Sequence, residues 1–174
     1  GTSTGGATAA NASLALNTDA ALYTSQTYKT WGGVMPTSSV FTVDGNNANG
    51  TETEGIIAYC FANIEGFIKV GSYVGNANAD GTFVYTGFRP SFMMCKPVVA
   101  GAWRIQDTKR SPFNAAAATL YPNLSAAEEA YTSSDIDILS NGFKMRASDS
   151  NYNQATTFVY LAMAENPFKY SLAR

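Results

Sequence analysis

Short apolar runs separated by turn residues make up most of the chain. Alternating or continuous apolar patterns predict strands over 40–43, 55–63, 67–74, 82–86, 91–98, 102–106, 135–139, 143–146 and 157–165. Gly and Asn clusters between these runs, such as 75–76, 80–81 and 140–142, tolerate the positive φ angles of tight turns. Many short strands of this kind predict an all-β fold, an antiparallel β-sandwich of jelly-roll or laminin-G-like character.

Two segments depart from the strand pattern. Ser125 is followed three residues later by Glu128, which forms the capping box of a helix start and predicts one short helix over 125–131. Residues 1–12 consist largely of Gly, Thr, Ser and Ala without periodicity, which predicts a linker or extended arm.

The apolar pattern recurs once, imperfectly, at a spacing of 102 residues. Residues 39–49 align with 141–151, so that Phe41 meets Phe143, and residues 56–62 align with 158–164. We interpret this as an imperfect repeat of about 100 residues. Residues 13–66 would be the C-terminal part of a first repeat, and 67–174 a second repeat packed with it as one β domain. Because the first copy lacks a counterpart of 67–102, we expect the chain to be the C-terminal piece of a longer polypeptide.

Composition narrows the classes of partner. Charged residues make up 14% of the chain, against roughly 25% in an average soluble protein. Uncharged polar Asn, Ser and Thr supply the surface, as is common in extracellular and virion-surface β-proteins. The formal net charge is −2, so no basic field attracts a phosphate backbone, and we expect no nucleic-acid partner. The sequence has no run of 18 apolar residues, so we expect no membrane insertion.

The chain contains no histidine, which removes the usual general base and metal ligand. Asp135 and Asp137 would share one face of a strand, but this placement does not guarantee the carboxyl separation that a glycosidase needs. The turn at 44–50 fails the calcium-loop pattern, because Ala48 occupies a ligand position. We therefore expect no enzyme activity, no cofactor and no metal.

Two cysteines occur, Cys60 and Cys95. Cys60 aligns with Ala162 in the second copy, which indicates a site for a small buried side chain. We therefore interpret both as free structural thiols, with one disulfide bridge as the alternative.

Candidate contacts come from one loop and one cationic cluster. Residues 151–154 combine a Tyr ring with amide groups that pair with sugar hydroxyls or with another subunit. The Arg side chains of 104–110 offer forked donors for an anionic sugar, although a solvated strand end with local ion pairs is the simpler interpretation. The candidate receptor or interface contacts are Tyr152, Asn151, Asn153, Gln154, Arg104, Lys109 and Arg110.

Several stretches carry a family resemblance. They include Gly87-Phe88-Arg89-Pro90 and the closing Ala164-Glu165-Asn166-Pro167-Phe168-Lys169. Over most of the chain after about Leu14, the sequence resembles a C-terminal domain of uncharacterised function in tail-fibre-like and other structural proteins of marine bacteriophages. The stretch Met93-Met94-Cys95 departs from the β-branched residues more usual there.

The resemblance implies a non-enzymatic phage virion protein, made in the bacterial host cytoplasm and located in a tail fibre or appendage that binds a receptor on the host surface. The implied partners are further copies of itself in a homo-oligomer, with a trimer as one form, other virion proteins, and a cell-surface glycan or protein receptor. Two alternatives stay open: an architectural capsid-decoration or filament subunit, and a polysaccharide depolymerase module.

Overall fold

The computed structural model describes residues 12–24, 31–43, 56–130, 136–148 and 152–167. By its internal contacts the chain divides into two compact units. The first comprises residues 1–15 and 20–60, and the second comprises residues 16–19 and 61–174. All the strands named below belong to the second unit.

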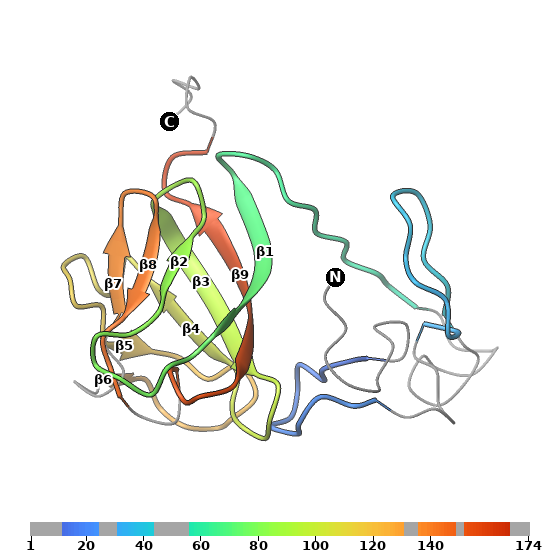
Figure 1. Cartoon of the computed structure of the whole chain (residues 1–174), viewed down its shortest axis with the longest axis horizontal. Coiled ribbons are helices and arrows are strands. Elements are labelled where there is room, and N and C mark those ends of the chain that lie inside the picture. The colour runs from blue at the N-terminus through green and yellow to red at the C-terminus, as the bar shows by residue number, and fades with distance from the viewer. Residues whose placement is uncertain (1–11, 25–30, 44–55, 131–135, 149–151, 168–174) are drawn as a thin grey trace. The chain divides into compact units, whose positions relative to one another are not determined.

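The second unit is built from antiparallel sheets (Figure 1). The largest has four strands in the order β1 (Ile68–Val74), β9 (Thr157–Ala164), β3 (Pro90–Pro97) and β4 (Arg104–Asp107). A three-stranded sheet has the order β2 (Phe83–Tyr85), β8 (Gly142–Met145) and β7 (Ile136–Leu139). A two-stranded sheet pairs β5 (Ala118–Thr119) with β6 (Glu129–Ala130).

Aromatic side chains join the two larger sheets. Tyr73 of β1 stacks on Phe158 of β9, with ring centroids 5.0 Å apart and planes 4° from parallel. Phe143 of β8 meets Tyr73 edge-on at 6.0 Å. The Phe143 ring also meets the ring of Tyr160 of β9, with centroids 5.4 Å apart. The buried cluster also takes in Val84, Met93, Cys95, Ile136, Ile138 and Met145. Since both sheets contribute to one core, the architecture is consistent with a β-sandwich.

The predicted all-β, antiparallel class is confirmed, and seven of the predicted strands match β1, β2, β3, β4, β7, β8 and β9 to within about two residues, the usual scatter of strand ends. The predicted helix at 125–131 is wrong for its described part. Residues 125–128 have no regular structure, and Glu129 and Ala130 form β6. Glu128 lies 3.2 Å from the Arg110 guanidinium, and Glu129 accepts a 2.6 Å hydrogen bond from Tyr121. These contacts with residues outside the segment override the weak helix preference of so short a stretch.

The structure also contradicts the predicted equivalence of the two copies. Residues 40–43 and 56–62 form no strand, whereas their aligned segments lie in β8 and β9. Phe41 is 42% exposed, but Phe143 is 1% exposed. β9 forms backbone hydrogen bonds with strands on both sides, while residues 56–62 have no such ladder among the described residues. A shared apolar pattern therefore gives different structures where strand partners differ. The domain boundaries at 12 and 66 stay a prediction.

The first unit has local order of its own. Ser13 and Tyr23 exchange two backbone hydrogen bonds of 3.0 and 2.9 Å. Trp31 donates its indole N–H to the carbonyl of Ala12 at 2.9 Å and meets the Phe41 ring edge-on at 6.2 Å. No helix among the described residues is long and apolar enough to cross a membrane.

Both cysteines are free thiols, as expected, but they differ in environment. Cys95 is buried in the core, whereas Cys60 is exposed, so the predicted burial of Cys60 is wrong. Burial raises the pKa of the Cys95 thiol to about 11, because desolvation disfavours the thiolate more than the nearby Arg104 cation favours it.

A matched pair of truncations tests the asymmetry between the copies. Phe143→Ala should lower the free energy of unfolding by about 3 to 5 kcal/mol, because it opens a cavity between the sheets. Phe41→Ala should cost less than about 1.5 kcal/mol, the scale of one edge-on aromatic contact. Urea titration followed by circular dichroism measures both. Equal losses would show that Phe41 fills a core site equivalent to that of Phe143.

Thiol labelling tests the contrast between the cysteines. At pH 8 the folded protein should react rapidly with a thiol reagent at Cys60 alone, since a buried group with a pKa near 11 supplies almost no thiolate. Denaturant should expose the second thiol. Cys60→Ser should leave the folded protein unreactive; rapid labelling of that variant would contradict the burial of Cys95.

Candidate binding surface

The structure buries Tyr152 and Asn153 of the predicted recognition loop. Tyr152 is 1% exposed, and its hydroxyl shares a 3.0 Å hydrogen bond with the Thr119 hydroxyl. Its carbonyl accepts a 2.9 Å hydrogen bond from the Tyr73 hydroxyl, and burial raises the pKa of the Tyr152 phenol. The expectation of an exposed Tyr152 is therefore wrong, because the polar end of its ring is satisfied by protein groups rather than by water.

Asn153 is fully buried, and it organises the neighbouring turn. Its Nδ2 donates to Asn76 Oδ1 and to the Asn78 carbonyl, both at 2.7 Å, and to the Ala147 carbonyl at 3.0 Å. Its Oδ1 accepts a 3.0 Å hydrogen bond from the Asn76 N–H. The side chain thus replaces water for buried backbone groups, which is a structural role. Gln154 is half-buried, and Asn151 lies outside the described residues.

Arg104 is also enclosed, with 6% of its surface exposed. Its guanidinium carbon lies 4.5 Å from the centre of the Tyr152 ring and 5.3 Å from that of Tyr121. These distances fit cation–π contacts, which gain strength away from water. Its Nη1 is buried without a hydrogen-bond partner in the described part of the chain. In this structure Arg104 is a core side chain rather than a surface contact.

Of the two remaining predicted cations, Arg110 forms the local ion pairs of the simpler interpretation. Arg110 Nε lies 2.6 Å from Asp107 Oδ2, and its Nη1 lies 3.2 Å from Glu128 Oε2. Burial raises the pKa of Asp107, but N–H groups of Arg110 and Lys109 and the Arg110 charge outweigh it and hold that pKa below its ordinary value. The pair therefore adds stability that is lost as the pH falls through the lowered pKa. Lys109 is exposed.

A different surface carries exposed aromatic rings: the outer side of the three-stranded sheet. Val84 points into the core, so its neighbours Phe83 and Tyr85 point outward, and they are 43% and 64% exposed. The strand register extends this side into two rows across β2, β8 and β7. We call this surface the aromatic face, and its members are Phe83, Tyr85, Gly142, Lys144, Asp137 and Leu139.

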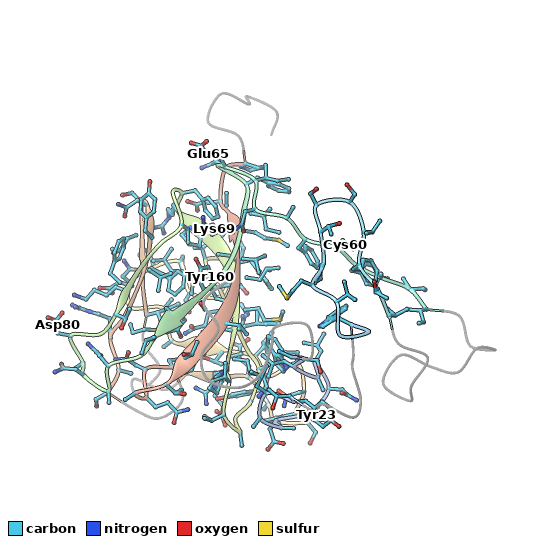
Figure 2. The ribbon with its side chains drawn as sticks, turned by 45° about the vertical axis from the view of Figure 1, so that its right-hand side comes forward. Tyr23, Cys60, Glu65, Lys69, Asp80 and Tyr160 are labelled. Carbon is cyan, nitrogen blue, oxygen red and sulfur yellow. The ribbon has the colours of Figure 1, made fainter. Side chains whose placement is uncertain are left out.

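Charged groups border the rings in pairs. Lys144 Nζ lies 2.5 Å from Asp80 Oδ1, and Arg146 Nε lies 3.0 Å from Asp137 Oδ2. The hydrogen bond from Lys144 and its charge hold the pKa of Asp80 below the usual range. Figure 2 shows Asp80 at the periphery of the second unit, whereas Tyr160 lies between its sheets. The face thus combines apolar rings with both donors and acceptors.

The lack of a side chain at Gly142 lets β8 approach β2 closely beside the Phe83 ring. A Cβ atom at this position would lie 2.1 Å from the Val84 carbonyl oxygen and 3.1 Å from the Phe83 ring. Any larger residue would collide with the backbone of β2, so only glycine permits β8 to pair this closely beside the ring.

The alternation of residues in the sequence predicts this face. The pattern predicts a strand over 82–86, and an aromatic residue on each side of a single Val means that the rings and the Val occupy opposite faces. If Val84 is core, both rings face solvent. Among the described residues no group of three or more His, Cys, Asp or Glu side chains could hold a metal ion.

These features describe an all-β protein with a solvent-facing aromatic and charged sheet surface. The chain belongs to the family described as Domain of unknown function (DUF7483), whose model matches residues 3–167. No curated protein and no solved structure matches the chain.

Substitution of Tyr152 tests the corrected interior role. Tyr152→Ala should lower the free energy of unfolding by about 3 to 5 kcal/mol, as expected for a buried aromatic ring. Tyr152→Phe should cost about 1 kcal/mol, because it removes only the hydrogen bond to Thr119. Thermal and urea unfolding measure both. An alanine variant as stable as the parent would restore the exposed-loop interpretation.

Proposed function

We propose that this chain is a non-enzymatic binding domain of a phage virion, in a tail fibre or another appendage, that attaches to glycans of the host surface. The virion assignment is supported by the resemblance of segments such as Gly87-Phe88-Arg89-Pro90 to phage structural proteins. As part of the same proposal, the sandwich is of the jelly-roll or laminin-G-like kind.

The observation that carries the binding role is the exposed pair Phe83 and Tyr85 on the aromatic face. Aromatic rings stack on the apolar side of a sugar ring, and adjacent charged groups pair with its hydroxyls. Lys144 and Asp137 occupy one row of the same surface as Phe83. Because acids and bases are paired there, the face suits a neutral or mixed-charge saccharide.

Binding of this kind needs no catalytic group. The chain has no histidine, and the strongly shifted pKa values of Tyr73, Cys95 and Tyr152 belong to core residues whose first cause is desolvation. The pKa of Asp80, on the border of the face, is lowered, which favours a permanently charged hydrogen-bond acceptor over an acid catalyst.

Removal of one exposed ring tests the proposal. Tyr85→Ala should weaken glycan binding about fivefold, since one ring contact contributes on the order of 1 kcal/mol. Glycan-array binding followed by titration of the best ligand measures the loss. Phe113→Ala is the matched control, because Phe113 is 82% exposed but lies outside the face.

The stability of both variants should match that of the parent, because exposed positions seldom shift it by more than about 0.5 kcal/mol. Unchanged affinity in Tyr85→Ala, or equal losses in the two variants, would refute the aromatic face as the site. Loss of viscosity of a polysaccharide solution on incubation with the protein would instead support a depolymerase.

A further inference from the structure

The outer side of the four-stranded sheet is apolar, although antiparallel sheets commonly place polar residues on the side away from the core. Core residues such as Tyr73, Cys95 and Tyr160 fix which positions point inward, and the alternate positions form the outer side. We call this outer surface the apolar sheet face. Its apolar members are Val70 and Val74 of β1, Val159, Leu161 and Met163 of β9, Phe92 and Met94 of β3, and Ile105 of β4. The uncharged polar residues Ser72 and Thr157 lie on the same side.

These side chains are contiguous and incompletely covered. Val70 pairs with Leu161, which pairs with Met94, which pairs with Ile105, so one apolar row crosses all four strands. Val70 is 39% and Val74 is 61% exposed, and the members on β9, β3 and β4 are half-buried. By contrast, the aromatic face of the other sheet interleaves its rings with ion-paired charges.

No free charge interrupts the centre of the apolar sheet face within the described residues. Lys96 belongs to the same side of β3, but it is fully buried, and its ammonium group donates to the Gly101 carbonyl at 2.6 Å and to the Asp19 carbonyl at 3.3 Å. Asp107, at the end of β4, is held by Arg110. A partner for this surface therefore needs apolar side chains and no complementary charge.

The size of the face suits a specific interface. Strands lie about 4.8 Å apart and rise about 3.3 Å per residue, so a sheet of four strands has a face on the order of 500 Å². Monomeric proteins seldom leave an apolar patch of more than a few hundred Å² in water. Two such faces together would cover on the order of 1,000 Å², the lower bound for a specific association.

We propose that the apolar sheet face binds the same face of a second copy of this chain, forming a two-fold dimer of stacked sheets. A two-fold axis brings like surfaces together, which is favourable for a face without charge and unfavourable for one with net charge. Two antiparallel sheets stack at about 10 Å with their apolar side chains interdigitated, the same packing that forms the core of each copy. The dimer leaves the aromatic face of each copy in solvent, so this inference does not depend on the glycan proposal.

The double variant Val70→Lys, Val74→Lys tests the dimer. Both positions are exposed in the single copy, so the charged side chains should leave the fold intact, but they place four ammonium groups in the two-fold interface. Sedimentation equilibrium of the full chain over a range of concentrations should give the mass of a dimer for the parent and of a monomer for the variant. Phe113→Lys, which adds a charge to an exposed position elsewhere, should leave the dimer mass unchanged.

A second measurement covers the case in which the double variant fails to fold. Ser72 lies between the two valines on the outer side of β1, and a Cys60→Ser, Ser72→Cys variant offers one exposed thiol per chain. A short bis-maleimide should link two copies of it at micromolar concentration, and a Phe113→Cys control in the same background should link far less.

Four results would overturn the proposal. A parent that stays monomeric at all concentrations excludes self-association, and a double variant that keeps the dimer mass places the contact elsewhere. If the parent is monomeric and the thiol of the Cys60→Ser, Ser72→Cys variant is unreactive, other residues of the same chain cover the face. A monomeric parent that binds neutral phospholipid vesicles shows that lipid is the occupant.

Discussion

The contact between the Phe143 ring and the rings of Tyr73 and Tyr160 holds the two larger sheets together, and both outer surfaces depend on it. An aromatic ring on β8 that points into the core forces its neighbours Gly142 and Lys144 to point outward. Tyr73 and Tyr160 fix the orientation of β1 and β9 in the same way. The aromatic face and the apolar sheet face are therefore the reverse sides of one core, and their compositions follow from strand alternation rather than from local loops.

Strand positions were predictable from the sequence because period-two and continuous apolar runs are local signals. Which run finds a partner is not local. The segments around Ile57 and Val159 have similar patterns, but only the second becomes the centre of a sheet, because β1 and β3 flank it. The helix expected after Ser125 failed for the same reason, since Glu128 and Glu129 meet partners outside the predicted helix.

Polar residues misled the expectation about the site in one specific way. A stretch of Asn, Tyr and Gln resembles a solvent-facing loop, yet Tyr152 and Asn153 are buried and bond to groups from other parts of the chain. Arg104 completes this interior polar region by stacking on the Tyr152 ring. Hydrogen-bond capacity can be read from residue types, but whether water or protein satisfies it depends on tertiary structure. The exposure of the Phe83 and Tyr85 rings, by contrast, can be predicted from the sequence once Val84 is assigned to the core side of its strand.

The position of β9 in the four-stranded sheet has a consequence for biosynthesis. It lies between β1 and β3, yet it follows both of them in the chain, and residues 98–156 separate it from β3. On the ribosome β3 can pair with β4, but β1 and the other edge of β3 have no partner strand until β9 arrives. Such late closure gives high contact order and a slow, aggregation-exposed stage. A nascent chain of this protein therefore exposes an unpaired edge on both β1 and β3 until β9, which ends at Ala164, can insert between them.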